Sequence, residues 1–316
     1  MKSIFTSRQF ILPCIATIGV GILGFWASVS AKPQTPPRFT KVENPGEFKL
    51  EGKGEPSVLN QKEKLPGEER AIIGSDDRIP MTSRDYPWSA IGKIEGIGAD
   101  GGGYSCTGTL IAEDVVLTNA HCVINPETQK VSQAMPTASF ANAFEPNLVN
   151  GVVKSKADIA YATNVYYGTD FKNGTLADYA NDWAILKLNK PIGKKYGYLG
   201  WKSLPSSTLV GDIKKFALVG YSGDFPNPKK KGYENLTAGE SMTAGVHLRC
   251  SILRRQDNLL YHNCDTNHGA SGGAIISNIN GKYYILALHS GSNEVNGLLL
   301  NRAVEMSRLD EWLQRN

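Results

Sequence analysis

The sequence has little net charge and few histidines for its length. Its 316 residues include 34 basic and 30 acidic side chains, giving a formal charge of +4 at pH 7. Such a balance argues against a polyanionic partner, so nucleic acid is not expected to bind. Only five histidines are present. Four of them lie in the C-terminal part, which leaves His121 alone in the first half. No internal repeat indicates a solenoid or propeller.

Long apolar runs are also scarce, and the one uncharged example extends from Phe10 to Val29. Basic residues precede it and small residues follow it, ending at Ala31, which is typical of a secretory signal peptide over 1–31. An uncleaved anchor is the alternative, since a membrane span takes about 20 apolar residues. Pro13 and several glycines interrupt the run and favour cleavage. We therefore expect a protein secreted to the periplasm or outside the cell, with no stable membrane insertion after cleavage.

Residues 32–70 are rich in proline, lysine and glutamate and contain few large apolar residues. Such a segment buries too little apolar surface to offset the entropy lost on ordering. A linker is one interpretation. Its position between a signal peptide and a larger domain favours a disordered propeptide, which would make the precursor a zymogen.

From residue 71 onward the sequence predicts an all-β domain over 71–316. Short apolar or alternating segments are separated by Gly, Pro, Asn and Asp. A C-terminal helix is expected, because four apolar residues spaced for one helical face occur near the end, namely Met306, Leu309, Trp312 and Leu313. The strands expected include Trp88–Glu95, Tyr104–Ala112, Trp183–Leu188, Lys215–Tyr221, Gly273–Ser277 and Tyr283–His289.

Glycines surround one serine in the string His268-Gly269-Ala270-Ser271-Gly272-Gly273-Ala274. Nucleophilic attack on a carbonyl needs a hydroxyl together with backbone N–H groups aimed at the resulting oxyanion. Gly269 and Ser271 can supply both, because glycine tolerates the positive φ that turns an amide toward a ligand. By itself the string could be only a tight turn.

A serine nucleophile also needs a histidine to accept its proton and a carboxylate to orient that histidine. His121 follows a strand-like run in Leu117-Thr118-Asn119-Ala120-His121-Cys122, and Asp182 precedes an apolar strand. Alone, each could be an ordinary strand-end residue. In the order His121, Asp182, Ser271, however, the three motifs resemble the chymotrypsin-like serine proteases.

This resemblance implies two six-stranded antiparallel β-barrels followed by the C-terminal helix. His121 and Asp182 would come from the first barrel and Ser271 from the second, with the active site between them. It further implies a monomeric serine endopeptidase that acts on protein or peptide substrates through an acyl-enzyme, without a cofactor.

Removing the signal peptide leaves four cysteines, Cys106, Cys122, Cys250 and Cys264. An even number in a secreted chain predicts disulfides, and four cysteines allow three pairings. A zinc site is the alternative, but no close Cys-x-x-Cys or Cys/His cluster supports a metal. The resemblance implies a bond between Cys106 and Cys122, and the pair Cys250–Cys264 then follows.

A closer resemblance, to bacterial glutamyl endopeptidases, begins at Ala71–Arg78 and continues through Tyr86–Ile91. Matches extend over most of 71–316. In that family a histidine, a threonine and the mature α-amino group bind the substrate glutamate. The resemblance therefore implies that His289, Thr266 and the amine of Ala71 bind this side chain after cleavage between Arg70 and Ala71.

Two alternatives remain open. Asp265 lies six residues before Ser271, where trypsin-like enzymes carry the aspartate that selects Arg or Lys, although glutamyl endopeptidases also have Asp-Thr here. The chain could instead be an inactive secreted binding protein on a protease fold. Ala270 replaces the aspartate with which trypsin-like zymogens capture their new N-terminus, so that activation switch is expected to be absent.

Overall fold

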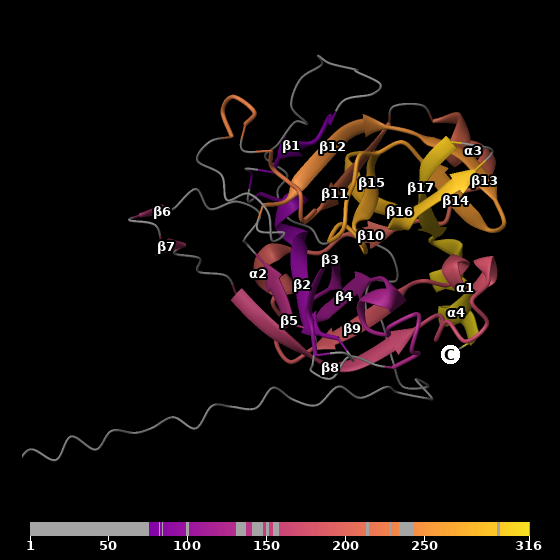
Figure 1. The fold of residues 1–316 in the computed structure, drawn as a ribbon, viewed down its shortest axis with the longest axis horizontal. Coiled ribbons are helices and arrows are strands. Elements are labelled where there is room, and N and C mark those ends of the chain that lie inside the picture. Colours follow the sequence, from indigo (N-terminus) through magenta and orange to yellow (C-terminus); the bar gives the residue numbers. More distant parts are fainter. Residues whose placement is uncertain are drawn as a thin grey trace, which may run out of the picture. The chain divides into compact units, whose positions relative to one another are not determined.

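The structure of the chain is a computed structural model (Figure 1). It describes residues 76–81, 83, 85–98, 101–130, 137–140, 148–149, 152–153, 158–212, 215–227, 229–233, 243–295 and 298–315. The expected signal peptide over 1–31, the expected propeptide over 32–70 and Ala71 lie outside these residues.

Six antiparallel strands close into the first barrel, in the order β2-β3-β4-β9-β8-β5 (Figure 1). Its interior is packed with apolar side chains, and Ile94, Leu110, Val116 and Leu186 are fully buried. Barrels this small are filled by their own side chains and leave no lumen. The strands are β2 (Ile91–Ile97), β3 (Gly103–Ala112), β4 (Val115–Thr118), β5 (Thr137–Phe140), β8 (Asp158–Tyr167) and β9 (Ala184–Leu188).

A second, nine-stranded sheet follows the order β1-β12-β11-β15-β16-β17-β14-β13, and β10 pairs in parallel with β16. All other pairings in this sheet are antiparallel. The prediction of an all-β chymotrypsin-like fold is confirmed. The strands are β1 (Ile79–Pro80), β10 (Gly200–Trp201), β11 (Phe216–Gly220), β12 (Gly245–Cys250), β13 (Ile252–Gln256), β14 (Leu259–His262), β15 (Ala274–Ile279), β16 (Lys282–Val295) and β17 (Leu298–Glu305).

The predicted C-terminal helix is present as α4 (Ser307–Arg315). Its Trp312 ring packs edge-on against Trp183, with ring centroids 5.2 Å apart. Because Trp183 follows Asp182 in the sequence, α4 supports the segment that carries this carboxylate. The remaining short elements are the 3-10 turns η1 (Trp88–Ala90) and η2 (Ala120–Cys122), the helices α1 (Leu176–Ala180), α2 (Gly193–Tyr196) and α3 (Ser206–Gly211), and the strand pair β6 (Leu148–Val149) and β7 (Val152–Val153).

The barrel and the sheet are joined at Thr107 of β3, which is fully buried. Its amide donates to the carbonyl of Ser271 (2.7 Å). Its hydroxyl donates to the carbonyl of Gly269 (2.8 Å) and accepts from the amide of Tyr221 (2.9 Å). The hydroxyl of Thr118 donates to the carbonyl of Thr107 (2.8 Å). These bonds hold the Ser271 loop against the first barrel.

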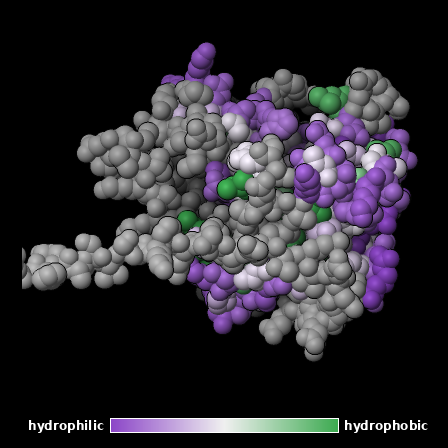
Figure 2. All heavy atoms as spheres, turned by 60° about the horizontal axis from the view of Figure 1, so that its bottom comes forward, coloured by the Kyte–Doolittle hydropathy of each residue, from purple (hydrophilic) through white to green (hydrophobic). Residues whose placement is uncertain are grey.

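The described surface in Figure 2 is mainly hydrophilic, with hydrophobic side chains scattered among the polar ones. Leu299, 76% exposed, is the most exposed large hydrophobic residue of the described chain. Hydrophobic residues exposed singly are normal for a globular protein. Within the described ranges, no helix combines the length and the apolar character needed to cross a bilayer.

Candidate active site

His121 and Asp182 are bound to each other by two hydrogen bonds. The backbone amide of His121 donates to Oδ1 of Asp182 (3.0 Å), and Nδ1 of the imidazole donates to Oδ2 (2.7 Å). Asp182 is fully buried, and the side-chain amide of Asn119 donates to its carbonyl (2.6 Å). A carboxylate can only accept, so the imidazole proton lies on Nδ1 and Nε2 is left as an acceptor.

The 3-10 turn η2 carries His121 and is fixed by the disulfide between Cys106 and Cys122 (S–S 2.08 Å). This bond links the turn to β3 of the same barrel. Sγ of Cys122 lies 3.9 Å from the carbonyl oxygen of Ser271. The turn that holds His121 therefore lies directly beside the loop that holds Ser271, although 149 positions separate Cys122 from the serine in the sequence.

Two consecutive turns shape the loop around Ser271. The amide of Ala270 donates to the carbonyl of Asn267 (3.0 Å), and that of Gly273 donates to the carbonyl of Ala270 (2.8 Å). Gly272 has a φ of +80°, and a Cβ placed on it would lie 2.2 Å from the carbonyl oxygen of Thr107. Only glycine fits this position, because both the conformation and the contact with β3 exclude a side chain.

The amides of Gly269 and Ser271 have no hydrogen-bond acceptor among the described residues. Gly269 has a φ of +94°. The carbonyl of His268, in the preceding peptide, accepts from the amide of Gly223 (2.7 Å). Since the N–H and C=O of a trans peptide point in opposite directions, the Gly269 N–H points away from Gly223. The loop thus presents two unpaired donors next to the serine, the arrangement that binds an oxyanion.

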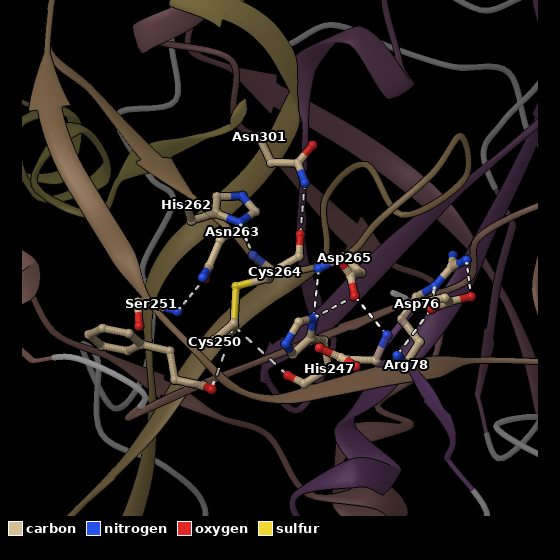
Figure 3. A network of polar contacts seen from close by, with 12 residues as sticks. Asp76, Arg78, His247, Cys250, Ser251, His262, Asn263, Cys264, Asp265 and Asn301 are labelled. Carbon is tan, nitrogen blue, oxygen red and sulfur yellow. Dashed lines mark hydrogen bonds and ion pairs between the residues drawn. A yellow bond between two sulfur atoms is a disulfide. The ribbon is translucent and has the colours of Figure 1, made fainter. Parts of the chain in front are cut away.

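A second histidine, His262 of β14, contacts the predicted pocket residue His289 of β16. The amide of Cys264 donates to Nδ1 of His262 (3.2 Å), so the proton of this ring lies on Nε2. That Nε2 donates to Nδ1 of His289 (3.2 Å). His289 therefore carries its own proton on Nε2, and this N–H is the donor that the ring can offer. Figure 3 shows His262 beside the chain of Cys264.

Both histidines are electrically neutral at neutral pH. His289 is 3% exposed and His262 is fully buried. Burial lowers the pKa of His262 to about 3 and that of His289 well below its usual range. The carbonyl of Arg302 favours the protonated form of each ring, but burial outweighs it. Among the predicted pocket residues, His289 is thus a neutral donor, and Thr266 lies partly buried in the loop between Cys264 and the serine.

Asp265 is bound by groups of the protein itself (Figure 3). Its Oδ2 accepts from the amide of Asp77 (2.8 Å) and lies 3.2 Å from Nδ1 of His247. Burial acts to raise its pKa, yet the interactions with the His247 side chain and the Asp77 backbone lower it overall. Asp77, His247 and Asp265 also have the donor types that could hold a metal ion. However, Nδ1 of His247 already accepts from the amide of Asp265 (2.8 Å), so its lone pair is occupied.

A sequence profile described as Trypsin matches residues 76–313. The chain belongs to the trypsin family. Serine protease 23 of Bos taurus is 29% identical over 219 residues, which cover 65% of this chain and 51% of that protein. Glutamyl endopeptidase of Bacillus licheniformis is 31% identical over 163 residues, or 51% of this chain and 45% of that protein. The chain thus spans about half the length of these curated relatives.

Two solved structures share the fold. A Glu endopeptidase in complex with MPD has a TM-score of 0.55 and 24% identity, covering 78% of this chain and 98% of its own. The thermostable serine protease AL20 from an extremophilic microorganism has a TM-score of 0.51 and 12% identity, covering 71% of this chain and 94% of its own. These two structures show the fold, and the Bacillus relative confirms the resemblance to glutamyl endopeptidases.

One charged cluster of this trypsin-family chain was missed by the sequence analysis. Arg78 is 6% exposed and forms ion pairs with Asp76 and Asp224, each 2.8 Å long. Burial opposes its charge, but hydrogen bonds to both carboxylates raise its pKa. The bond from Arg78 lowers the pKa of Asp224, and a further hydrogen bond from the side chain of Asn267 acts in the same direction. Arg78 is therefore linked through Asp224 to the loop that carries the serine.

The residue directly before the serine is Ala270, in place of the aspartate that trypsin-like zymogens carry there. Ala270 is 1% exposed and packs against Gly220 of β11, where even a Cβ on the glycine would lie 2.7 Å from the Cβ of Ala270. Arg78 and Asp224 are linked to the same loop through the side chain of Asn267. The sequence signal for this ion-pair cluster is the Asp76-Asp77-Arg78 string, in which a basic residue follows two acidic ones.

The second predicted disulfide pair is also bonded. Cys250 and Cys264 have an S–S distance of 2.13 Å and close a loop with a sequence separation of 14. Cys264 precedes Asp265 and Thr266, and its amide is the donor that fixes the tautomer of His262. The disulfide therefore anchors one end of the segment that carries the predicted specificity residues.

Proposed function

We propose that the chain is a secreted serine endopeptidase that cleaves peptide bonds after glutamate, with aspartate as a poorer substrate, through an acyl-enzyme. One observation carries this proposal. The buried carboxylate of Asp182 fixes His121 through two hydrogen bonds, beside a loop that presents Ser271 and two unpaired amides.

In the proposed reaction, Oγ of Ser271 attacks the scissile carbonyl while Nε2 of His121 accepts the hydroxyl proton. Asp182 stays ionised, holds the proton of His121 on Nδ1 and stabilises the imidazolium. The amides of Gly269 and Ser271 donate to the oxyanion. His121 then protonates the leaving amine, and a water molecule activated by the same imidazole hydrolyses the ester.

The preference for glutamate rests on His289, Thr266 and the amine of Ala71. Nε2–H of His289 is a donor whose tautomer is set by His262. A hydroxyl and an α-ammonium group complete a set of donors suited to a carboxylate. The rival preference for Arg or Lys would need a carboxylate at Asp265 that is free to bind the substrate. Here that carboxylate accepts a hydrogen bond from the amide of Asp77 and contacts His247.

Maturation between Arg70 and Ala71 fits this arrangement. The amide of Asp77 is bound to Asp265, the residue directly before Thr266. An extended chain advances about 3.3–3.6 Å per residue, so the segment from Asp77 back to Ala71 can span up to roughly 20 Å. The freed amine can thus reach the pocket. The two disulfides suit the oxidising compartment to which a cleaved signal peptide would deliver the protein.

The test uses the mature protein and matched peptides that differ only in the residue before the scissile bond, namely Glu, Gln, Asp, Lys or Arg. We expect the highest kcat/KM with Glu, and a serine-directed phosphonate should label Ser271. Ser271→Ala should reduce kcat by several orders of magnitude, leaving roughly 10³–10⁴-fold catalysis over water. Equal cleavage after Gln and Glu, or a lead for Lys or Arg, would refute the carboxylate pocket. Absence of both labelling and cleavage would favour the inactive binding protein.

A further inference from the structure

Arg302 of β17 is a cation with no carboxylate partner among the side chains that the structure describes. Its Nη1 donates to the carbonyl of Ser292 (3.3 Å) and to the side-chain oxygen of Asn293, which are both neutral acceptors. Its Nε is buried and finds no acceptor within the described chain. The guanidinium lies over the ring of Tyr179, with Cζ 4.1 Å from the ring centroid. The positive charge is thus held in place without being neutralised.

The environment makes this charge costly. Burial lowers the pKa of Arg302, and the groups that oppose this effect, Asp182 foremost, form no hydrogen bond with the guanidinium. Asp182 already accepts two hydrogen bonds from His121. By contrast, Arg78 and Arg255 each form an ion pair with a carboxylate. Desolvated charges without partners are found preferentially at functional sites, where a ligand supplies the opposite charge.

Arg302 lies next to the candidate active site. It pairs with Gly291, two residues beyond His289 on β16, and a Cβ on that glycine would lie 3.1 Å from Nη2 of Arg302. The missing side chain of Gly291 leaves room for the guanidinium. Tyr179, beneath it, precedes Asp182 by three residues. Arg302 therefore extends from the second sheet toward the part of the first barrel that carries Asp182.

An unpaired strand edge runs from the serine toward this arginine. β15 pairs with β16 only as far as Leu288, and the amide of Gly272 binds the carbonyl of His289 (2.9 Å). From Ser290 onward, the described residues of β16 pair with β17 alone. An extended peptide can add to such an edge as a further strand. The residues that precede a scissile bond at Ser271 would then lie along β16.

We propose that Arg302 and Tyr179 form a second subsite, which binds an acidic side chain at the second or fourth substrate residue counted back from the scissile bond. The inference rests on the proposed function, because it uses the substrate position at Ser271. Side chains of a strand alternate between its two faces. If the first residue points into the His289 pocket, the second and fourth point the other way. Nη1 of Arg302 is already bound and Nε is buried, so Nη2 is the nitrogen that can donate a charge-assisted hydrogen bond to such a carboxylate.

The experiment measures kcat/KM on peptides with Glu before the scissile bond and Glu, Gln or Lys at the second, third or fourth position back. Wild type should prefer Glu over Gln by roughly tenfold to a hundredfold at the second or fourth position, the range of one charge-assisted hydrogen bond. At the third position the ratio should be near one. Arg302→Met should abolish the preference and Arg302→Lys should retain part of it. Arg255→Met is the matched control, because Arg255 already has Glu305 as its partner, and it should leave the ratio unchanged.

A ratio near one at every position in wild type would overturn the subsite, and so would a preference that survives Arg302→Met. Cleavage after a residue other than Glu, with the upstream acidic preference intact, would support Arg302 and refute the glutamate pocket. If no peptide is cleaved, affinities of the same peptides for Ser271→Ala decide the question. Tighter binding of the Glu than of the Gln peptide, reduced in Ser271→Ala/Arg302→Lys and lost in Ser271→Ala/Arg302→Met, would support the subsite, and equal affinities would overturn it.

Discussion

Gly272→Ala should damage both stability and catalysis, because Gly272 is where the Ser271 loop touches the first barrel. A Cβ at this position would lie 2.2 Å from the carbonyl oxygen of Thr107 and 2.3 Å from Oγ1 of Thr118. Ordinary contacts begin near 3.4 Å, so the loop must withdraw by about 1 Å. This movement pulls on the hydrogen bonds from Thr107 to the carbonyls of Ser271 and Gly269.

The magnitude follows from two contributions. A non-glycine residue at positive φ costs about 1–2 kcal/mol. Two weakened hydrogen bonds add roughly 1–3 kcal/mol, so the free energy of unfolding should fall by about 2–5 kcal/mol. A displacement of about 1 Å in a reacting group can reduce the rate by roughly a hundredfold. We therefore expect kcat/KM to fall by about that factor.

Gly281→Ala separates the contact from the backbone strain. Gly281 has a φ of +81°, close to the +80° of Gly272, but a Cβ there would meet nothing within 4 Å. This variant should lose only about 1–2 kcal/mol and keep its activity. The measurements are urea unfolding and kcat/KM on one Glu peptide for both variants. Equal losses of stability, with kcat/KM of Gly272→Ala within about threefold of wild type, would refute the reasoning.

Three further predictions concern named side chains. In Asp182→Asn, the oxygen of the new side-chain amide must still accept from the backbone of His121. The NH₂ group of the asparagine then faces Nδ1 of His121, which moves the imidazole proton to Nε2. We expect kcat to fall by about 10⁴-fold, and a loss under tenfold would contradict the assigned tautomer. Burial lowers the pKa of His262 in the folded state from 6.5 to about 3. The free energy of unfolding should therefore fall by on the order of 5 kcal/mol as the pH drops from 6.5 toward 3. Urea unfolding across this range should show a weaker pH dependence for His262→Gln, and an unchanged pH dependence would refute the assignment to His262. Arg78→Met removes the ion-pair partner of Asp76 and Asp224 and should lower the free energy of unfolding by roughly 1–3 kcal/mol. This is less than for a fully buried pair, because both carboxylates are partly exposed. The Tm and kcat should both decrease, whereas an unchanged kcat would show that the link to Asn267 does not support the loop.

Much of the fold could be predicted from the sequence because its signals are local. Alternating apolar residues indicated the strands, and spaced apolar residues indicated α4. Even so, strand ends depended on pairing. β16 continues past the predicted end at His289 to Val295, because β17 supplies hydrogen-bond partners to a polar segment that has no strong strand pattern of its own.

The sequence by itself determined which motifs surround His121, Asp182 and Ser271, since each motif is a short string of neighbouring residues. Only the tertiary structure decided what lies beside them. His262 and His289 are hydrogen-bonded although they are 27 positions apart in the sequence, and Asp77 and Asp265 are hydrogen-bonded across a separation of 188 positions. Such contacts depend on which strands pair and in which register, and neither follows from the residues on either side of a motif. The same holds for Arg302, because only the tertiary structure decides whether a carboxylate lies near its guanidinium and how deeply that group is buried.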